Sequence, residues 1–64
     1  MEYTNSQIKA VIAEHVHKER DRQVLVLFYA DEMTQEWIAE KFKMSVRGIQ
    51  EIIYRHREKI SKNL

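Results

Sequence analysis

The stretch from residue 35 to residue 54 constrains the fold more than any other, because its apolar residues predict two helices joined by a very tight turn. One apolar set is centred on Ile38 and a second begins at Ile49, both at helical spacing. Ser45 lies between them, where the N-cap of the second helix is expected. The small side chain of Ala39 would let the two helix backbones come close. Two short helices cannot bury both apolar faces alone, so the rest of the chain is expected to cover them.

The composition favours an all-α fold in a single small domain spanning residues 1–64. The chain has no proline and one glycine, Gly48, which argues for helices joined by short links rather than strands joined by turns. A chain of this length buries only about 60% of its unfolded surface and is therefore marginally stable. It has no cysteine, so neither a disulfide nor a thiolate metal site is expected.

Several classes of function are not expected for this sequence. His15 and His17 are two residues apart on a predicted helix and point away from each other, so they are a poor metal pair. No serine has a base and an acid placed around it, and no glycine-rich phosphate loop is present, so neither an enzyme nor a cofactor is expected. No apolar run reaches membrane-spanning length and no signal peptide opens the chain, which predicts a cytoplasmic protein without membrane contact.

Charge is distributed unevenly along the chain, although the net charge is only +1. Residues 1–40 hold four basic and eight acidic side chains, a net charge of −4, whereas residues 41–64 hold seven basic and two acidic ones, a net charge of +5. A basic end of this kind suits a polyanionic partner. The alternative is a solvated basic helix whose cations are favoured near its C-terminus.

Capping residues predict where the helices begin. Thr4, with Gln7 three residues later, matches the capping-box pattern. Thr34 is the expected N-cap of a further helix, and Ser45 is the expected N-cap of a long amphipathic one. The four predicted helices cover about residues 5–17, 20–30, 35–42 and 45–60.

The predicted helix over residues 20–30 carries an apolar stripe that is too wide for one buried face. Val24, Leu25 and Phe28 share a side and are expected in the core. Two interpretations stay open for the other apolar side chains: partial exposure would mark a protein contact, whereas a central helix would be covered nearly all round. These side chains are Val26, Leu27 and Tyr29.

The helix over about residues 45–60 meets the requirements of a recognition helix in the DNA major groove. Such a helix needs base-reading side chains near its N-terminal end, polar or cationic groups for phosphates, and a second helix that braces it. Arginine and glutamine read guanine and adenine edges, glutamate accepts from cytosine, and an apolar side chain contacts the thymine methyl. The base-reading candidates are Val46, Arg47, Gln50, Glu51 and Tyr54. The phosphate-binding candidates are Thr34, Gln35, Lys43, Ser45, Arg55, Arg57 and Lys59.

The stretch RDRQVLVLFY at residues 20–29, followed by TQEWIAEKF from Thr34, is similar to region 4 of bacterial sigma-70 family factors, especially the extracytoplasmic-function type. The resemblance implies an all-α, four-helix domain with a helix-turn-helix. It also implies sequence-specific binding to double-stranded promoter DNA, a role in transcription, and RNA polymerase as a partner. The residues that match in order and spacing are Arg20, Arg22, Val24, Leu25, Leu27, Tyr29, Thr34, Ile38, Ala39, Ser45, Ile49, Ile53, Arg55 and Ile60.

The sequence departs from the pattern of this family at three positions. Lys43 stands where the family usually has a glycine in a left-handed turn, at a cost of about 1 kcal/mol. Trp37 replaces a usually charged, outward residue, and His56 replaces a small one and is expected to be partly buried with its polar atoms satisfied. A sigma factor also needs a region 2, for which 64 residues leave no room, so the chain is not expected to act alone.

Two other functions remain open. The chain could be a protein-interaction module, in which the helix over residues 20–30 and Trp37 dock RNA polymerase or another partner and DNA binding is incidental. It could also be a phage-type packaging or recombination accessory that uses the same motif. If it binds DNA, a homodimer or a second subunit is expected to raise an otherwise weak affinity.

Overall fold

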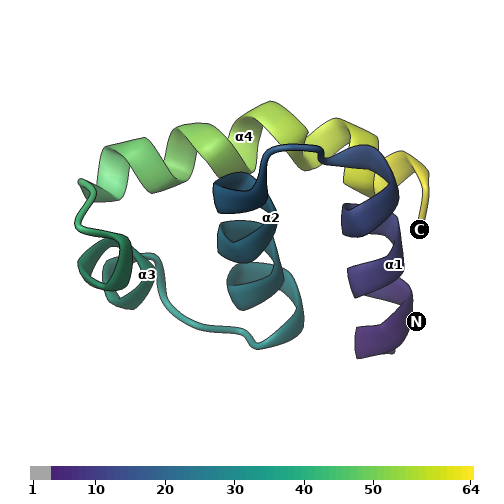
Figure 1. Cartoon of the computed structure of the whole chain (residues 1–64), viewed down its shortest axis with the longest axis horizontal. Coiled ribbons are helices and arrows are strands. Elements are labelled where there is room, and N and C mark those ends of the chain that lie inside the picture. The colour runs from purple at the N-terminus through teal and green to yellow at the C-terminus, as the bar shows by residue number, and fades with distance from the viewer. Residues whose placement is uncertain (1–3) are drawn as a thin grey trace.

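A computed structural model of the chain describes residues 4–64, and Figure 1 shows its helices. The first three residues of the predicted domain lie outside the described residues. Helices account for the secondary structure of the part described, which confirms the prediction of a small all-α, four-helix domain. The elements are α1 (Asn5–His15), α2 (Glu19–Leu25), the π-helical turn η1 (Val26–Ala30), α3 (Gln35–Phe42) and α4 (Val46–Lys62).

All three predicted N-caps are confirmed. The Thr4 hydroxyl accepts a hydrogen bond from the backbone N–H of Gln7 at 3.1 Å, and the Gln7 side chain accepts one from the Thr4 backbone N–H at 2.9 Å. Thr34 accepts from the Trp37 N–H at 3.1 Å, and Ser45 accepts from the Gly48 N–H at 3.0 Å. Each bond satisfies a backbone donor that has no partner within its own helix, which is why these residues begin helices.

Helix α1 ends at His15, two residues before the predicted end at residue 17. Val16 is extended and buried, so the chain turns inward there instead of continuing the helix. The guanidinium of Arg22 donates to the carbonyl of Val16, and also to that of Ala13 at 3.2 Å. A cation at the C-terminal end of a helix is favourable and satisfies carbonyls that the helix leaves unpaired.

The predicted helix over residues 20–30 is α2 followed directly by η1. In η1 the backbone N–H of Asp31 bonds to the carbonyl of Val26 at 3.1 Å, so the turn is wider than in an α-helix. Val24 and Leu25 are fully buried, as predicted. Phe28, predicted in the core, is only half-buried: it packs against the buried cluster from its edge, and its ring lies edge-on to that of Tyr29. The side chains of Val26, Leu27 and Tyr29 are also half-buried.

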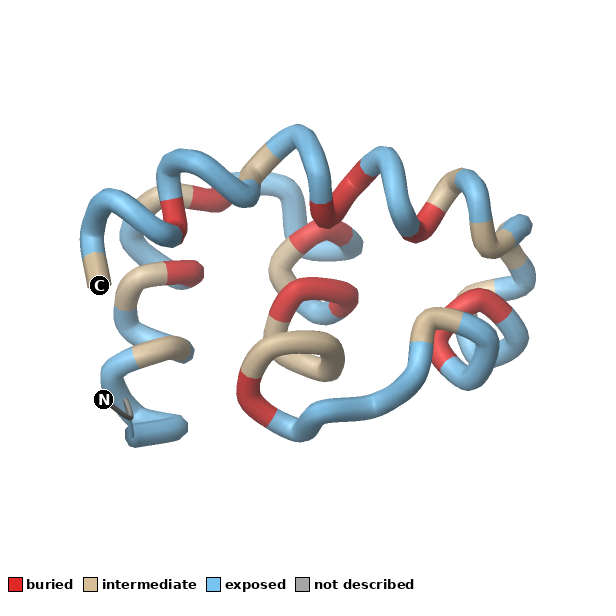
Figure 2. Tube along the Cα trace, turned by 180° about the vertical axis from the view of Figure 1, so that it is seen from behind, coloured by how far each residue is buried: buried red, intermediate tan, exposed pale blue. Residues whose placement is uncertain are grey.

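The core lies where α4 crosses the other helices. Figure 2 shows that buried positions recur along the side of α4 that faces the other elements, with exposed positions between them. Ala39 on α3 is 4% exposed and belongs to the same cluster as Ile49 on α4, in agreement with its predicted place at the helix crossing. The buried apolar cluster consists of Ile12, Val16, Val24, Leu25, Ile38, Ala39, Ile49, Ile52, Ile53 and Ile60.

The turn between α3 and α4 is fixed by a left-handed residue at Lys43, with φ 56° and ψ 44°. The backbone N–H of Met44 bonds to the carbonyl of Ala39 at 2.9 Å, and the N–H of Lys43 bonds to that of Glu40 at 3.3 Å. This is the Schellman pattern, in which glycine is the usual left-handed residue. The predicted left-handed position of Lys43 is therefore confirmed, and the turn holds α3 at a fixed angle to α4.

Candidate nucleic-acid interface

The outer face of α4 brings together four of the five predicted base-reading residues. The side chains of Arg47, Gln50, Glu51 and Tyr54 line one shallow hollow, and Arg55 borders it. All five are exposed; Arg47 is 87% exposed and Tyr54 is 75% exposed. They are spaced three or four residues apart on one helix, which places them on a common face. This face begins in the first turn of α4, which α3 braces.

Val46, the fifth predicted base reader, is placed differently. It is half-buried and packs against the core cluster, so it lies at the edge of the α4 face rather than projecting from it as expected. As the first residue of α4, it lies beside the tight turn, where the chain is still close to α3. A contact between Val46 and a thymine methyl stays a prediction.

Gln50 is tied to α3 by a hydrogen bond across the helix pair. Its Nε2 donates to Oε1 of Gln35, the first residue of α3, at 3.0 Å. A side-chain amide has two donor hydrogens and an acceptor oxygen, so this bond leaves Gln50 with both a donor and an acceptor for a base edge. The bond also fixes the direction of the amide before any ligand binds.

Arg47 is paired loosely on its own helix. Its Nε lies 3.9 Å from Oε2 of Glu51, four residues further on, and both side chains are mostly exposed. An exposed pair at this distance contributes at most a few tenths of a kcal/mol, so either side chain can exchange this partner for another at little cost.

The predicted phosphate-binding residues do not form one set. Thr34 and Ser45 use their hydroxyl oxygens as helix caps, which leaves each hydroxyl hydrogen available to an acceptor. Lys43 is exposed at the turn between α3 and α4. Lys43 and Ser45 therefore lie at the turn that precedes α4, whereas Thr34 and Gln35 lie at the N-terminal end of α3, which Gln35 joins to Gln50 of α4.

Arg57 and Lys59 lie away from the hollow on the α4 face. Arg57 lines a separate depression beside Tyr29, and Lys59 lines another beside His15 of α1. Burial raises the pKa of the Tyr29 phenol above its ordinary value of 10.0, and the positive charge of Arg57 partly opposes the rise. The structure therefore separates these two cations from the other phosphate-binding candidates.

Asp21 is a buried charged residue that sequence reasoning missed. It is 2% exposed and connects α2 to α4, because its Oδ2 lies 3.2 Å from Nε2 of His56. This contact explains the partly buried, satisfied His56 that the sequence predicts. Asp21 precedes Val24 and Leu25 by three and four residues, so helical spacing already placed it on the core face.

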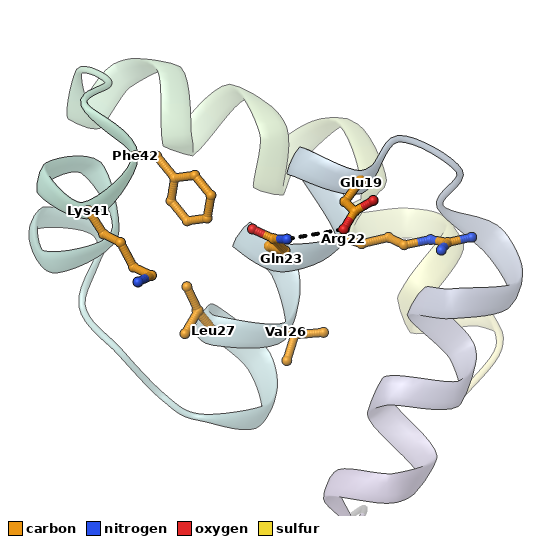
Figure 3. Close-up of a pocket in the computed structure, with 7 residues that line it drawn as sticks. All are labelled: Glu19, Arg22, Gln23, Val26, Leu27, Lys41 and Phe42. Atoms are coloured by element: carbon orange, nitrogen blue, oxygen red, sulfur yellow. Dashed lines mark hydrogen bonds between the residues drawn. The ribbon is translucent and has the colours of Figure 1, made fainter.

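A second surface lies between α2, η1 and α3, as Figure 3 shows. It is a groove of about 420 Å³ into which Leu27 and Phe42 point from opposite sides. Trp37, also on α3, is 42% exposed, and the ammonium of Lys41 lies 5.8 Å from its ring centroid. The residues that line the groove are Glu19, Arg22, Gln23, Val26, Leu27, Lys41 and Phe42.

Comparison with known protein families decides the identity of the domain. A family model described as sigma-70, region 4 matches residues 18–60, which include α2, η1, α3 and most of α4. The chain belongs to the sigma-70 region 4 family. Neither a curated protein nor a solved structure matches it.

Membership of the sigma-70 region 4 family confirms the helix-turn-helix and associates the chain with DNA binding and transcription. Region 4 domains bind DNA and RNA polymerase. The assignment to the extracytoplasmic-function type stays a prediction. Among residues 4–64, no helix is both long and apolar enough to cross a membrane.

Proposed function

We propose that the chain is a single sigma region 4 module, residues 1–64, that binds specific double-stranded DNA by placing α4 in the major groove. The observation that supports this most is the face of α4, where Arg47, Gln50, Glu51 and Tyr54 lie together, exposed, near the N-terminal end of a braced helix. A core helix or a solvated basic helix has no need for this combination of donors and acceptors.

Each side chain of the α4 face has a chemically defined role in this proposal. Arg47 donates to the O6 and N7 atoms of guanine, and Glu51 accepts from the N4 amino group of cytosine. Gln50 bonds to N6 and N7 of adenine, and the hydrogen bond that it donates to Gln35 holds its amide in place for this contact. Tyr54 lies one turn further along and contacts a base edge or the sugar beside it.

The residues around this face bind the DNA backbone. Thr34 and Gln35 stand at the N-terminus of α3, where backbone N–H groups without helical partners favour a phosphate. Lys43 and Ser45 lie at the turn, and Arg55 lies at the other border of the face. Arg57 and Lys59 are further from the face and would reach phosphates only at the far end of a site.

RNA polymerase is the proposed protein partner. With that partner the module acts in transcription initiation, or in its regulation, through the DNA-reading helix α4. A second copy of the chain would raise affinity in the same way as a second subunit. The dimer stays a prediction.

Docking of RNA polymerase or another protein, with DNA binding incidental, is the second candidate function. The groove between α2, η1 and α3 favours it, because Val26, Leu27 and Phe42 present apolar surface there. The acidic side chains of α3, Glu36 and Glu40, also suit a protein partner better than DNA. Both functions can coexist, because the groove and the α4 face use different residues.

The proposal is tested by selecting bound duplexes from a random pool and then titrating salt against the selected duplex. About six phosphate contacts predict that log K falls with log salt concentration with a slope of about −5. Arg47→Ala, Gln50→Ala and Arg55→Ala combined should abolish the sequence preference. Lys9→Ala with Lys18→Ala removes the same positive charge from exposed positions outside α4 and should preserve it. No enrichment, or no binding even at low salt, would show that α4 does not read DNA.

A further inference from the structure

The carboxylate of Asp21 is shared by three basic side chains from two helices. Its Oδ1 accepts from Nε and Nη2 of Arg20, its neighbour on α2, both at 3.3 Å. Its Oδ2 faces α4, with Nε2 of His56 at 3.2 Å and Nη1 of Arg55 at 3.7 Å. A buried carboxylate requires such partners, because removing it from water is otherwise unfavourable. Asp21 therefore joins the supporting helix directly to the helix of the α4 face.

Arg55 differs from the other two partners in its geometry. It is 58% exposed and borders the α4 face, whereas the His56 side chain is 19% exposed. The distance of 3.7 Å from Arg55 to Asp21 is an ion-pair distance and exceeds that of a hydrogen bond. His56 occupies the hydrogen-bonding position at the same oxygen, so the guanidinium of Arg55 is held by charge while its N–H groups stay available to a second acceptor.

We propose that Asp21 is a positioning residue for DNA binding: it holds the Arg55 guanidinium at the edge of the α4 face in the orientation that donates to a phosphate. Asp21 itself is buried and does not touch DNA. This inference rests on the proposed function, because it assigns Arg55 to the DNA backbone. Fixing a flexible side chain before binding saves the entropy of ordering it, which corresponds to about a two- to ten-fold gain in affinity.

The direction in which Asp21→Asn changes DNA affinity distinguishes a positioning role of Asp21 from a simple effect of its negative charge. Removing a negative charge from a DNA-binding domain should strengthen binding to a polyanion. If Asp21 positions Arg55, Asp21→Asn should instead weaken binding, and it should do so only while Arg55 is present. A purely structural role of Asp21 would weaken binding whether or not Arg55 is present.

A double-mutant cycle on the full chain distinguishes these cases. Dissociation constants for the selected duplex are measured at one salt concentration for wild type, Asp21→Asn, Arg55→Ala and the double variant. Asp21→Asn is expected to weaken binding two- to ten-fold in the wild-type background, and not to weaken it in the Arg55→Ala background. Asp31→Asn, the same chemical change at an exposed position, is the control and should not weaken binding. An equal effect of Asp21→Asn in both backgrounds, of either sign, would overturn the proposal.

A measurement on the wild-type protein covers the case in which Asp21→Asn does not fold. The side-chain Nε–H of Arg55 should show higher NMR order parameters than that of Arg47 in the free protein, and equal mobility of the two would overturn the proposal. Failure of the proposed function gives a different result, namely Arg47→Ala and Arg55→Ala variants that bind DNA as the wild type does. If those variants lose affinity while Asp21→Asn shows no coupling to Arg55, the positioning role alone fails.

Discussion

The α4 face and the groove between α2, η1 and α3 are two surfaces of one small domain with opposite chemistry. On the α4 face, polar and charged side chains such as Arg47 are exposed and project into solvent. In the groove, half-buried apolar side chains such as Leu27 and Phe42 line a hollow. A polyanion favours the first kind of surface, and an apolar segment of a protein favours the second. The difference indicates that DNA binding and protein docking can be separated by mutation.

The two surfaces share elements that support them. Helix α3 contributes Gln35 to the α4 face and Phe42 to the groove, and both lie on the same short helix. Substitutions in the common core should therefore damage both surfaces, whereas substitutions on one surface should leave the other intact.

The largest effect is expected for a core substitution that removes both surfaces at once. Ile49 is fully buried at the crossing of α3 and α4, and Ile49→Ala should lower the free energy of unfolding by about 2–5 kcal/mol. In a domain whose total stability is about 5 kcal/mol, this would unfold much of the population. Urea denaturation followed by circular dichroism measures the loss. Val11→Ala, at a half-buried edge position, is the control and should cost less. A loss below about 1 kcal/mol for Ile49→Ala would contradict the packing described.

The next largest effect separates the two surfaces. Arg47→Ala should weaken binding to the selected duplex by about 1–3 kcal/mol, because a bidentate contact to guanine is lost. The free energy of unfolding should change by less than about 0.5 kcal/mol, since Arg47 is exposed and its pair with Glu51 is loose. Fluorescence anisotropy with the selected duplex and with a scrambled one measures the effect. An equal loss for both duplexes would show that Arg47 contacts phosphate rather than a base.

A smaller and opposite effect on stability is expected at the turn. Lys43→Gly should raise the free energy of unfolding by about 0.5–1 kcal/mol, because glycine adopts the left-handed conformation without a steric cost. The same change should weaken DNA binding by removing a cation beside the first turn of α4. Lys41→Gly, on the regular helix α3, should instead destabilise the domain. A destabilising Lys43→Gly would mean that its side chain contributes more to folding than the turn geometry indicates.

The smallest effect on DNA affinity is expected for a substitution in the groove between α2, η1 and α3. Leu27→Gln should leave the dissociation constant for the selected duplex within about two-fold of the wild type, because Leu27 is on the groove and not on the α4 face. Capture of purified RNA polymerase should weaken in the same variant if the groove docks it. A large loss of DNA affinity with an unchanged unfolding midpoint would show that the two surfaces are not independent.

Local signals in the sequence predicted most of the fold. The caps at Thr4, Thr34 and Ser45 and the left-handed Lys43 depend on residues that are close in sequence, so their chemistry could be recognised directly. The exact end of α1 could not be predicted in this way, because it depends on Arg22, whose side chain on α2 donates to the carbonyl of Val16. The π-helical turn at Val26–Ala30 was missed because its residue types do not distinguish it from a regular helix.

The same distinction between local and distant contacts applies to the candidate site. The α4 face was predictable because its residues share one helix and one periodicity. The role of Asp21 could not be predicted, because its partner His56 is 35 residues away and helical spacing does not show which side chains of two helices meet. The partial burial of Val46 depends on the angle between α3 and α4, which sequence spacing does not specify.

An NMR titration of the ¹⁵N-labelled protein with the selected duplex tests most directly whether α4 is the DNA-reading element. Binding in the major groove predicts the largest chemical-shift changes at Arg47, Gln50 and Tyr54, with smaller ones at Gln35 across the helix pair. The amide chemical shifts of Gln23 and Leu27, which line the groove, should not change. Changes concentrated in the groove, with α4 unaffected, would contradict DNA reading by α4.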